Sequence, residues 1–513
     1  MSTATLSTSE ASTAPKWAKV IDHTRCIGCH ACTTACKSEN SVPLGVTRTY
    51  VKYVDVGRFP SARRAFQVTR CNQCEDAPCV TACPTAAMHK RPDGIVDFDK
   101  SICIGCKACI AACPYDAIFI NPDDHSAEKC NFCAHRLDVG LEPACVVVCP
   151  TEALLVGDMN DPLSRLSGYV DRDAVSVRKP EKETRPKLFY KGAHQATLDP
   201  LAADRPDGGL FMWSEQPRVS HGVTAGHPEH ANSSAAAVVA YDVPHRAPWD
   251  FRVSLYTWTK SIAAGAYLIP VFLLLAGALG WDSPLWRFSA PVMAGAFLGL
   301  TGALLIWDLE HPTRFYYLLI KPQFRSWLVR GGMIIGGYGA VLFVHFLANF
   351  VAFGPAHRML VYLGVPLAVM TSIYTAFLFA QAKARDLWQS PLLPPHLFVQ
   401  TIMAGAGAMF PVAAVQEPGT VGLLAWLFAG ASLVHLLMVL GEATMTHGTA
   451  HAHLALREMT RGRYASFFWA SMVMGAVGLV APWSPIGGAL VGLLGLLAFE
   501  HAYVQAGQSV PLA

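Results

Sequence analysis

The sequence predicts two unlike parts in one chain: a small, cysteine-rich α+β module, followed by an all-α bundle of eight membrane-spanning helices. Three observations support this division. All sixteen cysteines lie in residues 1–150. The apolar residues, which make up 52% of the chain, concentrate after residue 260 in long uncharged runs. Between the two parts lies a stretch rich in Pro, Asp, Arg, His and Gly.

The cysteines form four groups of four with tight spacing. They are Cys26, Cys29, Cys32 and Cys36; Cys71, Cys74, Cys79 and Cys83; Cys103, Cys106, Cys109 and Cys113; and Cys130, Cys133, Cys145 and Cys149. Groups one and three follow C-x2-C-x2-C-x3-C, and groups two to four end in Cys-Pro, a run typical of iron–sulfur ligation. Three cysteines of one loop bind three irons, and the fourth reaches a second cluster. Sixteen cysteines therefore predict four [4Fe–4S] clusters held by paired groups.

Two other uses of cysteine fit this pattern less well. Disulfide frameworks of secreted proteins do not repeat C-x2-C-x2-C, and residues 1–15 contain neither a twin arginine nor an apolar core. Structural zinc prefers two C-x2-C pairs separated by a spacer. A zinc-stabilised docking scaffold stays open as an alternative, and it predicts a colourless protein.

Short apolar stretches beside the cysteine groups predict strands at 17–21, 94–98, 117–120 and 153–156. They give residues 16–157 the strand–loop–helix repeat of a bacterial ferredoxin, doubled. Residues 1–15 are rich in Ser, Thr and Ala and predict a disordered N-terminus. Residues 158–250 predict an extended linker or docking arm, in which 187–192 forms a short strand or docking segment. Its histidines are expected to be scattered surface residues rather than metal ligands: His194, His221, His227, His230 and His245.

Eight apolar runs predict the membrane helices of residues 251–513. They lie at 262–279, 288–306, 331–353, 359–380, 397–415, 421–441, 465–480 and 486–506. A helix that crosses a bilayer needs about 20 apolar residues, and most of these runs approach that length. The last two are shorter and are joined by Pro482-Trp483-Ser484-Pro485, so one re-entrant hairpin stays open as an alternative.

Loop charges predict the orientation. An even number of spans places both ends of the bundle on one side. That face carries Arg252, Lys260, Arg314, Lys321, Arg325, Arg330, Lys383, Arg385, Arg457, Arg461 and Arg463, whereas the opposite face carries Arg287 and Arg358. Since positively charged loops stay in the cytoplasm, we expect a multi-pass inner-membrane protein with a cytoplasmic iron–sulfur module. Basic loops that dock anionic clusters would produce the same bias. The net charge of +3 suggests no nucleic-acid partner.

Residues 16–157 resemble the four-cluster iron–sulfur subunit of molybdenum or tungsten bis-pterin oxidoreductases of the dimethyl sulfoxide, formate, nitrate and polysulfide type. The resemblance implies that groups one and four pair, as do groups two and three. The implied ligands are Cys26, Cys29, Cys32 and Cys149 for the first cluster; Cys130, Cys133, Cys145 and Cys36 for the second; Cys71, Cys74, Cys79 and Cys113 for the third; and Cys103, Cys106, Cys109 and Cys83 for the fourth. It also implies that the first cluster faces the catalytic subunit and the fourth faces the membrane.

Residues 250–513 resemble the polysulfide reductase/NrfD-like membrane anchors. The matching motifs are Asp308-Leu309-Glu310-His311-Pro312-Thr313-Arg314-Phe315, Tyr374-Thr375-Ala376 and the tail Ala506-Gly507-Gln508-Ser509-Val510-Pro511-Leu512. The resemblance implies eight helices, no haem, and a quinone near the face that docks the iron–sulfur subunit. It also implies that Tyr374 contacts the quinone.

Other polar residues of the membrane half have two interpretations each. Trp258 and Lys260 begin the first span on the same face as Tyr374. They are either further quinone contacts, or an interfacial aromatic residue and a snorkelling amine. His345 and His435 lie mid-span. Two such histidines are also typical haem ligands, but the resemblance favours hydrogen-bonded packing, with a proton path as the second alternative.

These observations predict an electron-transfer and membrane-anchor subunit. It would link a molybdenum or tungsten bis-pterin catalytic subunit to ubiquinone or menaquinone, in a complex open to higher oligomerisation. The partner would be a formate or sulfite dehydrogenase or a sulfur-compound reductase. No pterin or nucleotide fingerprint stands out, so this chain would carry only the quinone half-reaction. The alternative is an energy-converting, proton-translocating module of a larger respiratory complex.

Overall fold

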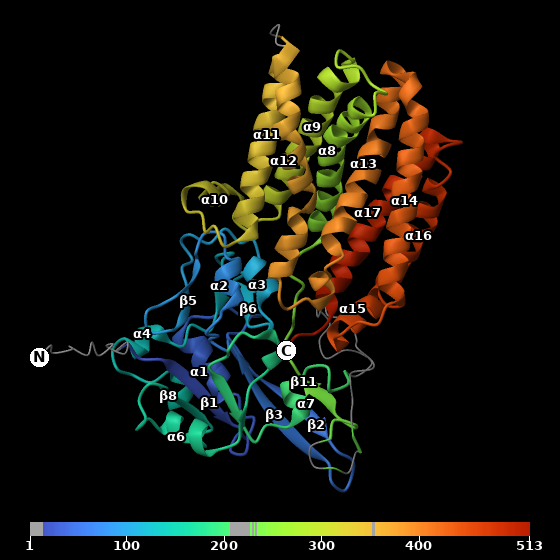
Figure 1. Cartoon of the computed structure of the whole chain (residues 1–513). Coiled ribbons are helices and arrows are strands. Elements are labelled where there is room, and N and C mark those ends of the chain that lie inside the picture. Colours follow the sequence, from blue (N-terminus) through green and yellow to red (C-terminus); the bar gives the residue numbers. More distant parts are fainter. Residues whose placement is uncertain (1–13, 206–225, 228–229, 231–232, 351–353) are drawn as a thin grey trace, which may run out of the picture.

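The computed structural model describes residues 14–205, 226–227, 230, 233–350 and 354–513. The cysteine-rich part, blue to green in Figure 1, lies beneath a bundle of long helices coloured green to red. The C-terminal residue lies at the junction between them. The predicted disorder of residues 1–15 falls mostly on residues 1–13, which lie outside the described residues.

The first sheet joins the two ends of the cysteine-rich module. Strand β1 (Trp17–Asp22) pairs antiparallel with β8 (Leu154–Asp158) and parallel with β10 (Leu188–Lys191). β10 also pairs with β9 (Val175–Ser176). Five of the six residues of β1 are buried, so this strand forms the centre of the sheet. The predicted strands at 17–21 and 153–156 are β1 and β8.

A second sheet was not predicted from the sequence. It consists of β2 (Thr49–Val56), β3 (Arg63–Arg70) and β11 (Val238–Tyr241), all antiparallel. Two small hairpins, formed by β4 (Met88–Lys90) with β5 (Val96–Phe98) and by β6 (Ile118–Ile120) with β7 (Ala127–Lys129), complete the strands. β5 and β6 correspond to the strands predicted at 94–98 and 117–120.

Five short helices contain or adjoin cysteines of the four groups. They are α1 (Ala31–Glu39), α2 (Pro78–Ala82), α3 (Ala108–Ala112), α4 (Ala134–Leu137) and α5 (Ala144–Val147). α2 begins with a proline, whose fixed φ suits the first helical turn, and Cys-Pro follows its end. These elements give the predicted α+β architecture.

Residues 158–250 are more than the extended linker expected from their composition. They supply β9, β10 and β11, together with α6 (Arg165–Arg172) and α7 (Gln195–Leu198). The strand predicted at 187–192 is β10. Strands of two to four residues owe their stability to partners far away in sequence, so composition does not reveal them. Residues 206–225, 228–229 and 231–232 lie outside the described residues, and the domain boundaries at 157 and 250 stay predictions.

Two histidines of this segment are buried instead of lying on the surface. His245 is 5% exposed and lies between Asp116 and Asp242, whose carboxylates accept from its two ring nitrogens. Burial alone would lower the pKa of His245, but the two carboxylates raise it to about 9. His194 is also buried, so the surface placement expected for these two histidines is wrong.

Seven helices of the described residues are long and apolar enough to cross a membrane. They are α8 (Phe251–Leu275), α9 (Ala290–Trp307), α11 (Trp327–Ala348), α12 (Gly354–Gln381), α13 (Leu393–Gln416), α14 (Val421–Thr444) and α17 (Pro485–Ser509). The shorter apolar helix α16 (Ala465–Gly478) is the eighth. α17 has 25 residues, too many for one arm of a re-entrant hairpin, which favours eight separate helices.

α8 lies in the middle of the bundle, and 83% of its most apolar 18-residue stretch is buried. It packs closely against α13 because both helices place a glycine at the contact. A Cβ on Gly265 would lie 2.3 Å from the carbonyl oxygen of Thr401 and 2.6 Å from Gly405. Small residues allow such close helix packing within membranes. The polar side chains of α8 are thereby fixed inside the bundle.

Candidate functional site

Two cavities in the cysteine-rich module are each lined by four cysteines. One is lined by Cys83, Cys103, Cys106 and Cys109, and the other by Cys26, Cys29, Cys32 and Cys149. These are the fourth and first sets implied by the resemblance. Each cavity combines three cysteines of one group with one cysteine of a distant group, as paired groups require.

The other two sets also gather. Cys36 interacts electrostatically with Cys130, Cys145 and Cys133. Cys79 interacts in the same way with Cys71, Cys113 and Cys74. Two of the implied sets thus line cavities, and the cysteines of the other two lie near one another.

The surroundings of the sulfur atoms suit thiolates bound to iron. Backbone N–H groups of Met88, Ala127 and Ala153 donate to cysteine Sγ atoms at 3.3, 3.4 and 3.3 Å. Burial raises the pKa of Cys109, so a thiolate there requires a bound cation, which iron supplies. In the described part of the chain, no three His, Cys, Asp or Glu side chains converge as a single metal ion requires. The sulfurs of the two cavities instead surround a space, as a cubane cluster needs.

The loop of the fourth set docks directly onto the membrane half. The backbone N–H of Glu310 donates to the Gly105 carbonyl at 3.3 Å, and Arg314 donates to the Cys103 carbonyl at 2.9 Å. Gln323 donates to the Cys83 carbonyl at 2.8 Å. The 308–315 motif identified in the sequence thus binds the loop that carries this set. Arg314, one of the basic residues that predict the orientation in the membrane, therefore also docks the iron–sulfur module.

Gly105 is required at this contact. Its φ is +68°, a left-handed conformation that residues with a Cβ rarely adopt. A Cβ there would lie 2.4 Å from the Cβ of Glu310 and 2.9 Å from its backbone nitrogen. Gly28 occupies the same place in group one with φ +71°, and the atoms nearest its Cβ would belong to the ring of Phe66.

Aromatic rings continue from the fourth set into the bundle. The indole N–H of Trp249 donates to the Cys106 carbonyl at 3.2 Å. Its ring stacks on Phe379 of α12 and on Trp388, with centroid distances of 5.9 and 5.5 Å. Trp249 carries no signal in the sequence, because it stands alone at the end of a polar segment.

Lys260 and Tyr374 lie together inside the bundle. The Lys260 ammonium donates to the Ser372 carbonyl at 2.7 Å and to the Thr375 hydroxyl at 2.8 Å. It lies 5.2 Å from the centroid of the Tyr374 ring. Lys260 is fully buried, so it is neither a snorkelling amine nor a loop charge.

Trp258 does not join this pair. Its indole N–H donates to the carbonyl of Leu493 on α17 at 3.0 Å. Residues 258 and 260 lie about 200° apart around a helix, so their side chains point to different neighbours. The indole of Trp258 therefore faces α17, and its predicted contact with the quinone stays a prediction.

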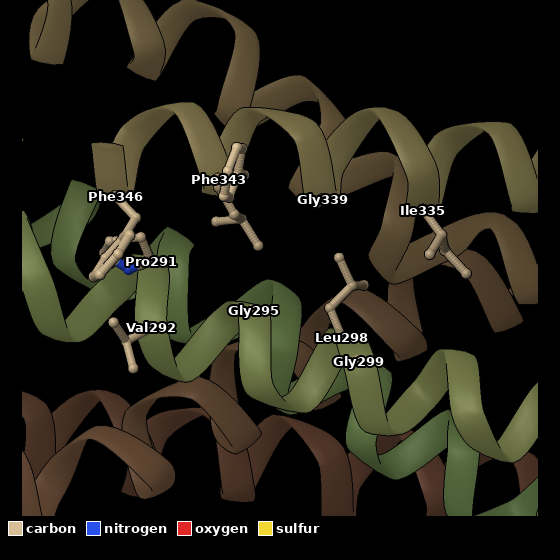
Figure 2. A pocket seen from close by; sticks show the side chains of 10 residues that line it. Pro291, Val292, Gly295, Leu298, Gly299, Ile335, Gly339, Phe343 and Phe346 are labelled. Atoms are coloured by element: carbon tan, nitrogen blue, oxygen red, sulfur yellow. The ribbon is translucent and has the colours of Figure 1, made fainter. Parts of the chain in front are cut away.

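An apolar groove of about 470 Å³ lies between α9 and α11 (Figure 2). Its lining consists of Pro291, Val292, Gly295, Leu298, Gly299, Ile335, Gly339, Leu342, Phe343 and Phe346. Ile335 lies one helical turn from Gly331, where a Cβ would lie 2.4 Å from the Tyr374 ring. Cβ atoms on Gly295 and Gly299 would meet no heavy atom of the described residues within 4 Å. The groove thus begins one turn from Gly331, which adjoins the Tyr374 ring, and Gly295 and Gly299 leave open space in it.

The two mid-span histidines predicted as packing residues are buried among other side chains. His435 Nδ1 lies 2.8 Å from His396 Nε2, and both rings pack against Phe499. His345 packs against Trp286 with a centroid distance of 4.4 Å. The sequence singled out His435 but not its partner His396, because a single sequence does not show which helices face each other.

Comparisons with known proteins match both parts of the chain. The family described as "4Fe-4S dicluster domain" matches residues 63–159, and "Polysulphide reductase, NrfD" matches residues 241–486. A tetrathionate reductase subunit of Salmonella typhimurium is 45% identical over 196 residues, covering 37% of this chain and 78% of that protein. A polysulfide reductase polypeptide of Wolinella succinogenes is 44% identical over 179 residues, covering 34% and 94%. The thiosulfate reductase electron transfer subunit PhsB of Salmonella typhi is 50% identical over 178 residues, covering 34% and 92%.

Proposed function

Because this protein belongs to the family of 4Fe–4S electron-transfer subunits of the tetrathionate, polysulfide and thiosulfate reductase type, fused to an NrfD-type multi-pass membrane domain, we propose that it carries electrons between a catalytic subunit and membrane quinone. The catalytic subunit is a separate molybdenum or tungsten bis-pterin protein. The three-plus-one cysteine cavities are the observation that carries this proposal.

The sixteen cysteines hold four [4Fe–4S] clusters in the four sets described above. When bound, each cluster supplies one-electron transfer. The protein binds the irons through thiolates, surrounds them with buried side chains and directs backbone N–H groups to the sulfurs. Iron analysis of the purified chain should find about sixteen irons, with a brown colour that dithionite bleaches. A colourless protein that holds zinc would contradict this assignment.

The first set faces the catalytic subunit. Cys29 is exposed, and Ile27, Val147 and Val148 beside this set are 57, 62 and 40% exposed. Exposed apolar side chains that surround a redox site are typical of a protein–protein interface. The fourth set lies at the opposite end of the series of cysteine sets, on the loop bound by the membrane domain.

The quinone head group binds beside Tyr374 and Lys260, and its apolar tail lies in the groove between α9 and α11. Quinone carbonyls need one or two hydrogen-bond donors in an apolar pocket, which a phenol and an ammonium supply. Lys260 also interacts electrostatically with Glu500, a buried acid suited to proton delivery. The basic loops favour an inner-membrane protein with this face in the cytoplasm.

Replacement of Tyr374 by Phe tests the quinone site. Tyr374→Phe should slow quinone-driven oxidation of the reduced clusters and leave their reduction by the partner unchanged. Tyr338→Phe is the matched control, because this buried tyrosine donates to the Ala263 carbonyl at 3.0 Å deeper in the bundle. Unchanged quinone kinetics in Tyr374→Phe would remove Tyr374 from the site.

The proton-translocating alternative requires buried acids that continue across the bilayer. In the seven described spans, the acids are Glu442 and Glu500, and both lie near the ends that adjoin the iron–sulfur module. This placement favours quinone chemistry at one face over a transmembrane path. Proteoliposomes that develop a membrane potential during turnover would support the alternative instead.

A further inference from the structure

A buried arginine lies between the first and second cysteine sets. Arg70 ends β3 and is 1% exposed. Its guanidinium donates to Cys145 Sγ at 3.0 Å, and its charge also acts on Cys32 of the first set and Cys130 of the second. Lys19 reaches the same Cys145 sulfur from β1 at 3.8 Å.

These two cations are not balanced by a carboxylate of the described residues. In the part of the chain that the structure describes, Nε and Nη2 of Arg70 have no hydrogen-bond partner. The Lys19 ammonium has Cys145 Sγ and the face of the Phe132 ring, 4.1 Å from its centroid, as neighbours. A buried cation without a carboxylate partner is stable only where some other group nearby carries negative charge. The thiolates of the second set are that group.

Both cations converge on one sulfur atom. The Arg70 guanidinium lies 3.0 Å and the Lys19 ammonium 3.8 Å from Cys145 Sγ. The positive charge is therefore concentrated at one corner of the second set.

The fourth set has a different charge environment. Lys107 lies beside Cys106, but its ammonium is paired with Asp308 and Glu310, each at 3.3 Å. The negative charge of Asp308 also acts on Cys106. The cation near the fourth set is thus neutralised, whereas those near the second set are not.

We propose that Arg70, assisted by Lys19, raises the reduction potential of the second cluster and not that of the fourth. The proposal rests on the ligand sets proposed above. A cluster that accepts an electron gains one negative charge, and a nearby buried cation stabilises that reduced form. Salt screens a buried charge much less than an exposed one, so the effect persists at physiological ionic strength. Arg70 is therefore a positioning residue. Its positive charge acts on the cluster through the sulfur of Cys145.

Redox titration followed by electron paramagnetic resonance tests the proposal on the full chain. Arg70→Gln should move the midpoint potential of the second cluster to a more negative value and leave that of the fourth unchanged. Arg70→Lys, which keeps the charge, should stay close to the parent protein. Arg64→Gln is the matched control on the same strand, because this exposed arginine pairs with Asp55 at 2.7 Å. The Cys145→Ser variant identifies which signal belongs to the second cluster.

The outcomes separate this proposal from the proposed function. Unchanged potentials in Arg70→Gln at full iron content would overturn the role of Arg70. An equal shift in Arg70→Lys would overturn it as well, because geometry rather than charge would then be responsible. If Arg70→Gln does not assemble clusters, Lys19→Met removes charge from the same sulfur, and it must produce a smaller negative shift. Parent protein with fewer than four clusters would contradict the proposed function itself.

Discussion

Replacing Gly105 by Ala tests how the iron–sulfur module docks onto the membrane domain. The left-handed φ costs a residue with a Cβ about 1–2 kcal/mol. Contact with the backbone of Glu310, 2.9 Å from the new Cβ, adds an overpacking cost of about 1–3 kcal/mol. Gly28→Ala is the matched control, because it has the same φ strain, but the atoms nearest its Cβ belong to the Phe66 side chain and not to the membrane domain.

The difference between the two variants is therefore the overpacking cost at the docking contact with Glu310. If that cost falls on the docking equilibrium, about 1–3 kcal/mol reduces the docked population by roughly 5- to 150-fold. Electrons then leave the fourth cluster more slowly.

The assay is stopped-flow oxidation of dithionite-reduced protein in nanodiscs by a quinone, followed by the cluster absorbance. Gly105→Ala should be slow, and Gly28→Ala should oxidise at the parent rate through the fourth cluster. Iron content must be equal in both variants. Equal rates for the two variants at full iron content would refute the inferred contact between Gly105 and the membrane domain.

Three further changes probe other parts of the structure. Because the pKa of His245 is raised from 6.5 to about 9, its stabilising contribution is complete below pH 6.5 and disappears as the pH rises through 9. The melting temperature should therefore fall over that range, and a His245→Gln variant that keeps the fall would contradict the argument. Lys260→Met removes two hydrogen bonds made by a buried ammonium and should cost about 1–3 kcal/mol in thermal denaturation, with partial recovery on adding Glu500→Gln; no destabilisation would argue against the buried ammonium. Gly299→Leu should fill the groove and raise the KM for long-tailed quinones but not for tail-less analogues. Gly336→Leu also has open space at its Cβ but lies outside the groove, so equal behaviour of both variants would exclude the tail site.

The cysteine sites were predictable because their motif is local. Four ligands fall within eleven residues in groups one and three, and Cys-Pro marks the cysteine that crosses to the other cluster. The long apolar helices were predictable for a similar reason, since a run of about 20 apolar residues leaves few alternatives. The family comparisons agree with both predictions.

The features that the sequence did not reveal depend on distant partners. β2 and β3 pair over eight residues, but Arg63 and Arg64 at the exposed start of β3 obscure the strand pattern. Lys260 seemed to be a charge at a helix end, yet acceptors on α12 hold its ammonium inside the bundle. Arg70 is an ordinary strand residue in the sequence, and only the fold shows that it touches Cys145.

The arrangement of the first two sheets has a practical consequence for making a water-soluble fragment. β10 covers one edge of β1, and β11 covers one edge of β2, although both strands come from residues after the last cysteine. A fragment cut at residue 157 would leave those edges bare and prone to aggregation. A fragment that ends after Tyr241 keeps both covering strands, so the useful cleavage point lies just before the first membrane helix.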